Sequence, residues 1–260
     1  MNFAKKSLGQ NFLVDKNIIK KIVNLSEIEN KHVIEIGPGK GALTDEILKK
    51  KPKTLTIIEK DFELVKILKK KYSTNNEINI FHNDILKFNL EKITKNKTII
   101  FGNLPYNISS QILVKLIKYN IWPPKFFDLI FMFQKELGEK IIGTYRSKNY
   151  GRLSILTNLR LKVIDTFHVS ANCFRPKPKI RSIVIHFKPK KMLFNIKDIS
   201  KLEKITNIFF SNKRKMINKN IKKILDKKKI DIIDKLNLNS RPAELKPEIY
   251  YKITELSERD

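Results

Sequence analysis

With 260 residues, the chain can form one large domain or a large and a small one, and its formal net charge of +28 favours a polyanionic partner such as nucleic acid. No run approaches the ~18 apolar residues of a transmembrane helix, and the first residues lack the apolar stretch of a secretory signal. The one cysteine, Cys173, can form neither an internal disulfide nor a cysteine metal cluster, so we expect a cytoplasmic protein with no membrane partner and no metal site.

Up to residue 187, β-branched runs alternate with amphipathic segments. Asp15 is placed to cap a helix whose apolar stripe runs from Ile18 to Val23. Strands are predicted over seven ranges, namely 32–36, 54–58, 78–81, 98–101, 127–133, 163–167 and 182–187. Further helices are expected near Ala42, around Leu64 and from Ile108. Because strands and helices alternate, the predicted fold class is α/β, with a mostly parallel sheet covered by helices.

Strand patterns stop after a linker-like stretch, Lys188–Lys191. Short helices are predicted beyond it, over 199–210, 216–225, 230–236 and 247–256. The sequence therefore predicts a large domain over residues 1–190 and a small all-α domain over residues 191–260.

The early strands of the predicted sheet end in residues that could bind a ligand, since ligands bind at the carboxyl ends of parallel strands. A glycine loop at 37–41 follows the first strand and lets the backbone approach a ligand closely. Glu59 could accept hydrogen bonds from a ribose diol, and Asp84 from an adenine amine. The alternative is that both acids cap the helices that follow them.

The fourth strand runs into the corner Phe101–Ser109. Asn103 offers an amide oxygen, Pro105 restricts the Leu104 carbonyl, and Tyr106 offers a flat face. Two acceptors beside an aromatic plane suit a ring with an exocyclic NH2 group, such as adenine flipped out of its stack. An ordinary strand-to-helix turn is the alternative.

Together these motifs resemble known methyltransferases. The glycine loop with the acid at Glu59 resembles the S-adenosylmethionine loop of class I methyltransferases, and Asn103–Tyr106 resembles their signature for methylating exocyclic amines. From about residue 5 to its end, the chain resembles the ribosomal RNA small subunit adenine N6,N6-dimethyltransferase family. The further stretches that carry this resemblance are Leu8–Leu13, Gln134–Glu136, Tyr150–Ser154, Phe174–Ser182 and Lys213–Lys215.

The resemblance implies a class I, Rossmann-like methyltransferase fold, with a seven-stranded sheet whose last strand is reversed and a small helical C-terminal domain. It implies transfer of methyl groups from S-adenosyl-L-methionine to N6 of two adjacent adenosines. These adenosines lie in the 3′-terminal hairpin of 16S rRNA, in the small (30S) ribosomal subunit or its precursor. A cytoplasmic monomer that takes part in small-subunit biogenesis is expected.

Carried over by motif, the resemblance also implies site residues. Cofactor contacts are expected at Asn11, Leu13, Gly37, Glu59, Asp84 and Asn103. Catalytic roles are expected at Asn103, Leu104, Pro105, Tyr106 and Phe174. Tyr106 is expected to stack on the base and Phe174 to cover its other face, although a core position for Phe174 is an open alternative.

RNA contacts are expected at a basic cluster in the C-terminal domain, formed by Lys213, Arg214, Lys215, Lys219, Lys222 and Lys223. The chain is richer in lysine than in arginine, which weakens bidentate phosphate contacts. Enrichment in lysine, isoleucine and asparagine is also typical of AT-rich genomes, so compositional drift is an alternative source of part of the charge.

Other functions are open at this point. The sister group that methylates large-subunit rRNA shares the catalytic signature, but Phe209–Lys215 resembles the small-subunit type better. A non-catalytic RNA-binding assembly factor would not need the intact Asn103–Tyr106 motif and glycine loop. A DNA adenine methyltransferase is disfavoured because the chain has no large target-recognition insert.

Overall fold

The fold comes from a computed structural model that describes residues 10–259. The chain divides into two compact units. The first comprises the chain up to Lys115, Ile121–Gly138 and Val163–Pro189, and the second comprises Leu116–Asn120, Glu139–Lys162 and Lys190–Asp260. The expected division at residues 1–190 and 191–260 stays a prediction, and two segments before residue 190 group with the C-terminal unit.

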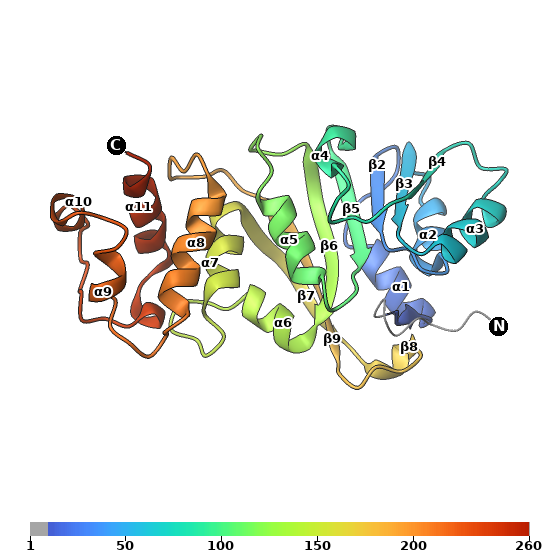
Figure 1. Ribbon diagram of the computed structural model, residues 1–260. Helices are drawn as coiled ribbons and strands as arrows, with labels where there is room; N and C mark the ends of the chain where they lie inside the picture. The colour runs from blue at the N-terminus through green and yellow to red at the C-terminus, as the bar shows by residue number, and fades with distance from the viewer. Residues whose placement is uncertain (1–9, 260) are drawn as a thin grey trace. The chain divides into compact units, whose positions relative to one another are not determined.

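A seven-stranded sheet has the order β4-β3-β2-β5-β6-β9-β7 (Figure 1). Its strands are β2 (His32–Ile36), β3 (Thr54–Glu59), β4 (Ile78–His82), β5 (Thr98–Asn103), β6 (Phe126–Gln134), β7 (Leu161–Val169) and β9 (Ser182–Pro189). The pairs between β4 and β6 are parallel, whereas β9 runs antiparallel to β6. The mostly parallel sheet with a reversed last strand, predicted from the sequence, is therefore confirmed.

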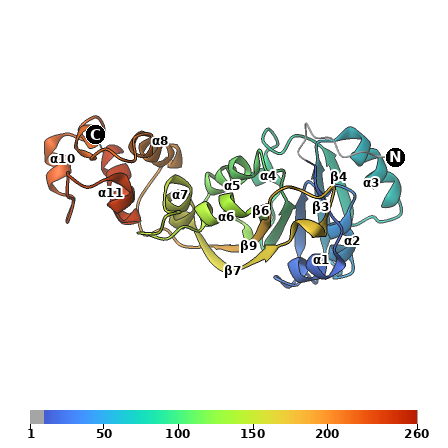
Figure 2. The same cartoon turned by 90° about the horizontal axis from the view of Figure 1, so that it is seen from below.

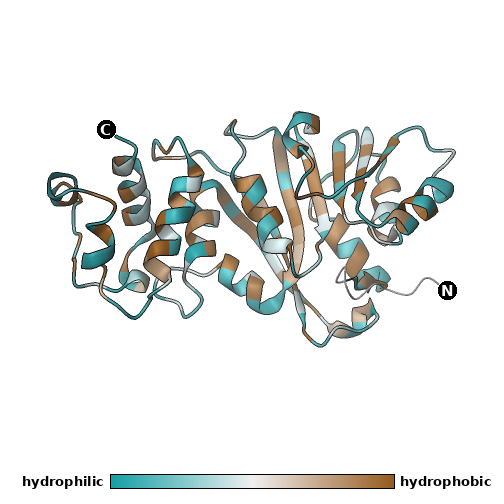
Figure 3. Ribbon diagram, in the orientation of Figure 1, coloured by the Kyte–Doolittle hydropathy of each residue, from teal (hydrophilic) through white to brown (hydrophobic). Residues whose placement is uncertain are grey.

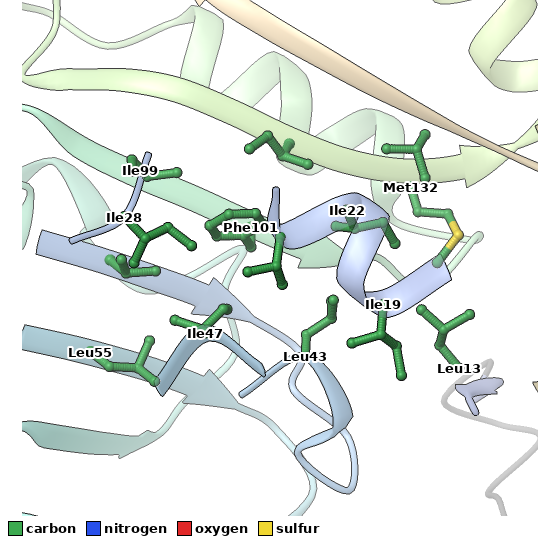
Figure 4. Close-up of a cluster of buried hydrophobic side chains, with 14 of the residues drawn as sticks. Leu13, Ile19, Ile22, Ile28, Leu43, Ile47, Leu55, Ile99, Phe101 and Met132 are labelled. Atoms are coloured by element: carbon green, nitrogen blue, oxygen red, sulfur yellow. The ribbon is translucent and has the colours of Figure 1, made fainter. Parts of the chain in front are cut away.

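A cluster of buried apolar side chains lies on one face of this sheet. Helices α1 (Lys16–Val23), α2 (Ala42–Leu48) and α3 (Phe62–Lys71) supply side chains that pack with those of β3 and β5. Figure 4 shows Ile22 of α1 near Phe101 of β5, and Ile19 near Leu43 of α2. In Figure 2, turned by 90°, α3 lies beside β4 at the edge of the sheet. The expected cap of α1 is present, because the Asp15 side chain accepts hydrogen bonds from two amides of the first turn.

The strands at the centre of the sheet are the most apolar part of it. Hydrophobic colour runs along β5 and β6 in Figure 3, and Phe101, Phe131 and Phe133 are fully buried there. The helices after β4, β5 and β6 are α4 (Leu90–Ile93), α5 (Ser109–Ile117) and α6 (Lys135–Ile141), and α7 (Arg152–Arg160) lies between α6 and β7. Two short strands, β1 (Phe12–Leu13) and β8 (Phe174–Arg175), pair antiparallel beside the 3-10 turn Ala171–Cys173.

The second unit is helical. Its core is formed by α7, α8 (Ile199–Phe210) and α11 (Pro247–Ser257), which contact one another. Between α8 and α11 lie α9 (Asn218–Ile221), α10 (Lys227–Asp231) and the 3-10 turn Pro242–Glu244. Here two predicted helices differ from the structure. Residues 222–225 continue α9 only as turns, and α10 begins earlier than expected because Asp226 caps it by accepting from the Lys229 amide.

Candidate active site

A cavity of about 690 Å³ opens at the carboxyl ends of β2, β3, β4 and β5, within the first unit. Its lining includes all but one of the residues that the sequence predicts for catalysis or cofactor binding. Those residues are Asn11, Leu13, Gly37, Glu59, Asp84, Asn103, Leu104, Pro105 and Tyr106. Their individual roles stay predictions, but they meet because parallel strands end at one edge of the sheet.

The loop between β2 and α2 depends on glycine. Gly37, Gly39 and Gly41 have φ angles of 66°, 60° and 81°, a backbone conformation that other residues rarely adopt. A Cβ atom on Gly39 would lie 2.9 Å from the Phe12 ring, so the loop and β1 approach each other closely. Phe12 also lines the cavity, and sequence reasoning did not assign it to the site although it lies inside the N-terminal motif. Leu8 and Gly9 of that motif lie outside the described residues.

Glu35 lies on β2, below the glycine loop, and lines the cavity although it is only 1% exposed. The Thr44 hydroxyl of α2 donates a hydrogen bond to Glu35 Oε2 at 2.6 Å. Burial raises the pKa of Glu35 to about 7, against the lowering effect of that hydrogen bond. Near neutral pH this carboxyl is therefore divided between its neutral and charged forms.

Glu59 at the end of β3 is held in place by backbone amides. Its Oε1 accepts hydrogen bonds from the amides of Lys60 and Asp61, both at 2.8 Å. Its Oε2 lies 3.4 Å from the Gly39 amide across the cavity rim. Burial raises the pKa of Glu59, while these backbone hydrogen bonds lower it. The alternative that Glu59 caps the next helix is wrong, because Asp61 is the N-cap of α3 and accepts from the Glu63 amide. The Glu59 carboxylate still has lone pairs for a ligand.

Asp84 follows β4 and faces the same cavity. Its Oδ2 accepts from the Lys60 ammonium at 2.8 Å, and its Oδ1 accepts from the Leu86 amide at 2.9 Å. The Lys60 hydrogen bond holds the pKa of Asp84 below its usual value, so this carboxylate is charged at neutral pH. It thus offers an acceptor in a fixed position at the cavity wall.

Sequence reasoning missed Lys115, which lies on α5. Its ammonium donates to three backbone carbonyls directly after Asp84, those of Ile85, Leu86 and Phe88, at 2.8, 2.7 and 2.8 Å. Burial lowers the pKa of Lys115. The side chain therefore ties the Asp84 loop to the helix that follows the Asn103–Tyr106 motif. The sequence feature that could have indicated this role is a single lysine within the apolar stretch Ile112–Ile117.

A backbone carbonyl orients the amide of Asn103. Asn103 Nδ2 donates to the Asn11 carbonyl oxygen at 3.2 Å. A carbonyl oxygen can only accept, so the amide nitrogen must face Asn11. Within residues 10–259, Oδ1 of Asn103 has no hydrogen-bond partner. This oxygen can therefore accept a hydrogen bond from a group bound in the cavity.

The residues that follow Asn103 are held rigidly. Leu104 is 1% exposed, and a Cβ atom on Gly102 would lie 2.5 Å from the Leu104 side chain, so the close approach requires glycine. The Tyr106 hydroxyl lies 2.7 Å from Ser182 Oγ, which fixes the ring from β9. Burial raises the pKa of Tyr106, so the phenol stays neutral and its ring can act as a stacking surface.

Phe174 is the predicted catalytic residue that the structure places elsewhere. It is fully buried, pairs with Leu13 across β1 and β8, and belongs to the apolar core cluster. It is absent from the cavity lining. This position favours the alternative of a core aromatic, which the sequence left open, because a stacking ring must have a face free for the base.

The predicted RNA-binding side chains lie in the second unit, and all of them are exposed. Lys213, Arg214 and Lys215 occupy the turn after α8, Lys219 lies on α9, and the last two follow α9 in a turn. Their binding role stays a prediction.

Residues 10–259 contain neither a membrane-spanning helix nor a metal-binding cluster of these kinds. None of the helices there is long and apolar enough to cross a membrane. No group of three or more His, Cys, Asp or Glu side chains that could hold a metal ion lies within residues 10–259.

Comparison with known proteins identifies relatives along the whole chain. A sequence profile of the ribosomal RNA adenine dimethylase family matches residues 1–258. The chain is 48% identical over 253 residues to ribosomal RNA small subunit methyltransferase A of Pelagibacter ubique, which covers 96% of this chain and 95% of that protein. It is 40% identical over 256 residues to the protein of the same name from Malacoplasma penetrans, covering 96% and 91%.

Solved structures agree with these sequence relatives. A dimethyladenosine transferase from Plasmodium falciparum matches with a TM-score of 0.76 and 27% identity, over 93% of this chain and 95% of that one. The 23S rRNA methyltransferase ErmE matches with a TM-score of 0.68 and 22% identity, over 96% of this chain and 100% of that one. At this identity the likeness establishes a shared fold only. The class I methyltransferase fold predicted from the motifs is therefore confirmed. The chain belongs to the ribosomal RNA adenine dimethylase family.

Proposed function

We propose that this protein transfers methyl groups from S-adenosyl-L-methionine to N6 of two adjacent adenosines in the 3′-terminal hairpin of 16S rRNA. Membership of the adenine dimethylase family and the 48% identity to a small-subunit methyltransferase support this reaction. The observation that carries it is Oδ1 of Asn103, which has no hydrogen-bond partner among residues 10–259. Asn103 lines a cavity rimmed by a glycine loop and two carboxylates. It acts in the cytoplasm as a monomer on the small subunit or its precursor.

The lining residues fit the proposed cofactor. The glycines with positive φ angles leave room for a ligand against the backbone of the loop. Asn11 and Leu13, from the N-terminal segment, line another part of the cavity wall. Glu59 accepts hydrogen bonds from a ribose diol, and Asp84 from the adenine amine. When bound, S-adenosyl-L-methionine supplies an electrophilic methyl group on a sulfonium.

The Asn103–Tyr106 motif binds the target base. The adenine amine is a poor nucleophile because its lone pair is delocalised into the ring. Asn103 Oδ1 and the Leu104 carbonyl accept hydrogen bonds from its N–H groups, which favours a pyramidal nitrogen. Tyr106 stacks on the base and Pro105 fixes the turn. Positioning of this kind can lower the barrier by ~7–11 kcal/mol, and no strong base is needed because the proton leaves after attack.

The reaction is tested by mapping modified nucleosides after incubation with labelled cofactor. We expect N6,N6-dimethyladenosine at two adjacent positions in immature small subunits and none in large-subunit RNA. Label in large-subunit RNA alone would assign the protein to the sister group, and no label in either RNA would leave a non-catalytic assembly factor. Light scattering checks the monomer.

The role of Asn103 is tested with Asn103→Ala. We expect kcat to fall by about 10²–10³-fold, the range for removal of one preorganised hydrogen-bonding group. Cofactor affinity, measured by calorimetry, should stay within about tenfold because Glu59 and Asp84 remain. Equal turnover of variant and wild type at saturating cofactor would refute this role.

A further inference from the structure

A second hollow, of about 510 Å³, lies in the first unit at the opposite ends of the strands from the active site. It is lined by the first residues of β2, β3 and β4 and by the loops that precede β5 and β6. In Figure 1 the helix nearest to these strand ends is α4, which is only four residues long. Lys92 and Ile93 of this helix line the hollow, so α4 forms part of its wall.

The floor of this hollow is polar, which is unusual for a parallel sheet, because such sheets are normally covered by helices and apolar on both faces. His32 and Thr54 lie opposite each other in register, as do Thr56 and Asn79. Asn79 is exposed, and so is the Phe81 ring farther along β4. The His32 Nδ1 atom lies 2.7 Å from Thr54 Oγ1, and Nε2 makes no hydrogen bond within the described part of the chain.

The rim of this hollow is positively charged. Lys92, Lys95 and Lys125 line it and are exposed, and no carboxylate from residues 10–259 belongs to the lining. Burial lowers the pKa of His32, and the charges of Lys95 and Lys53 lower it further.

The loop that carries Lys95 is anchored. Thr98 Oγ1 donates to the Lys95 carbonyl at 2.7 Å and accepts from the Lys95 amide at 3.1 Å. Thr94 Oγ1 donates to the Leu90 carbonyl, also at 2.7 Å. The lysine therefore projects from a backbone held on both sides.

We propose that this hollow binds the phosphodiester backbone of the substrate RNA, at a segment away from the base that is modified. The proposal rests on the proposed function for the presence of RNA. Ammonium, imidazole and amide groups are donors that recognise phosphate oxygens. The exposed Phe81 ring adds a surface on which an unpaired base can stack. Lys92 and Lys95 come from α4 and the loop after it, and Lys125 comes from the loop before β6. This spread along the rim fits an extended polyanion better than a single small ion.

Binding is tested first by NMR on the full-length protein, with the imidazole signals of His32 assigned through His32→Gln. We expect a 3′-terminal fragment of small-subunit rRNA to shift these signals in a saturable way. Inorganic phosphate at the same phosphate concentration should give no saturable shift. RNA that binds the protein but leaves His32 unchanged would overturn the proposal. Saturation by inorganic phosphate as tight as that by RNA would assign the hollow to a free anion instead.

A charge-matched pair of variants gives the energetic test. One variant carries Lys92→Gln, Lys95→Gln and Lys125→Gln, and the control carries glutamine at three exposed lysines that lie on or beside α2 and α3, Lys50, Lys69 and Lys70. Both have the same net charge, so a non-specific field affects them equally. We expect the hollow variant to bind the RNA fragment at least about tenfold more weakly and its salt slope to fall by about 2. The control slope should change by less than about 0.5, and equal losses in both variants would contradict a site.

Failure of this inference is separable from failure of the proposed function. A protein that dimethylates small subunits but shows no response of His32 to RNA retains the function and loses this site. A protein that transfers no methyl group to any RNA, whatever His32 shows, loses the function.

Discussion

At the scale of single residues, the partly buried ammonium of Lys115 holds the loop that carries Asp84, a predicted cofactor contact. Its three hydrogen bonds hold the carbonyls that follow Asp84. Lys115→Met keeps the length of the side chain but leaves those acceptors without their donor, which costs about 1–3 kcal/mol. We expect the KM for the cofactor to rise by about tenfold, while kcat at saturating cofactor stays within about threefold.

The control for this variant is Lys118→Met. The Lys118 ammonium pairs with Glu203 at 3.0 Å in a partly exposed ion pair, which contributes little. Steady-state kinetics of both variants distinguish the loss of the hydrogen bonds to the Asp84 loop from the mere loss of a lysine charge. An equal fall of kcat and kcat/KM in Lys115→Met, with no change in KM, would show that this lysine does not act through cofactor binding.

Glu35 makes the stability of the protein depend on pH. Its pKa is about 7 in the fold against 4.5 for the ordinary group, mainly because of burial. Between these values the folded protein holds a proton that the unfolded chain has lost, so the free energy of unfolding falls as pH rises from 4.5 to 7. The loss from this group is at most about 3 kcal/mol and is complete above the folded pKa.

Glu35→Gln tests this dependence. Urea unfolding of both proteins across the pH range gives the difference in unfolding free energy at each pH, which removes the contribution of all other groups. The variant should gain stability relative to the wild type as pH rises towards 7. A difference that does not vary with pH would mean that burial does not shift this carboxyl.

At the scale of elements, a buried polar cluster joins β6, β9 and the loop after α1. Asp128 accepts from Ser26 at 2.5 Å and lies 2.6 Å from His186 Nε2, and both Asp128 and His186 are buried. Asp128→Ala leaves the other two side chains without their shared acceptor, so we expect the free energy of unfolding to fall by about 3–5 kcal/mol. The adjacent Phe127→Ala, at a 44% exposed position on the same strand, is the control and should lose far less.

Chemical denaturation checks this cluster, and a second variant identifies its cause. If the cluster acts as a unit, Asp128→Ala with His186→Leu should be less destabilised than the sum of the two single changes. Additive losses would mean that the carboxylate and the imidazole stabilise the sheet independently.

The sheet was predictable from the sequence because each strand carries its own local signal. Val33, Ile57 and Ile99 belong to β-branched runs that are too short for helices, and turn residues separate them. The Asp15 cap is equally local, since one side chain satisfies the amides of the turn that follows it. Agreement between propensity and tertiary packing explains why these elements lie where they were expected.

What the sequence did not reveal depends on contacts between distant segments. Lys115 bonds carbonyls about 30 positions earlier in the chain, which no local pattern records. The burial of Phe174 follows from its pairing with β1, so its motif alone left its role open. The early start of α10 is an exception, because it comes from a local cap in which Asp226 accepts from the Lys229 amide.

At the scale of the whole molecule, the net charge of +28 has two possible origins with different consequences. Charge selected for RNA binding is concentrated where phosphates meet the protein, whereas compositional drift places lysine on every solvated face. Each contact that neutralises a phosphate releases counterions and adds about 0.7–0.9 to the slope of log affinity against log salt. The salt slope therefore measures how many lysines contact phosphates, and lysines away from the RNA do not contribute to it.

The last prediction compares two glutamine variants of the second unit that carry the same net charge. The first changes the predicted RNA-binding residues, Lys213, Arg214, Lys215, Lys219, Lys222 and Lys223. The second changes six other exposed lysines, Lys191, Lys197, Lys204, Lys227, Lys228 and Lys246. If all six predicted residues contact phosphates, the slope of log affinity for small subunits against log salt should be about 4–5 smaller in the first variant than in the wild type. The slope for the second variant should stay within about 1 of the wild-type slope. Equal slopes for the two variants would show that these six side chains belong to the drift, because only the position of the charge differs between them.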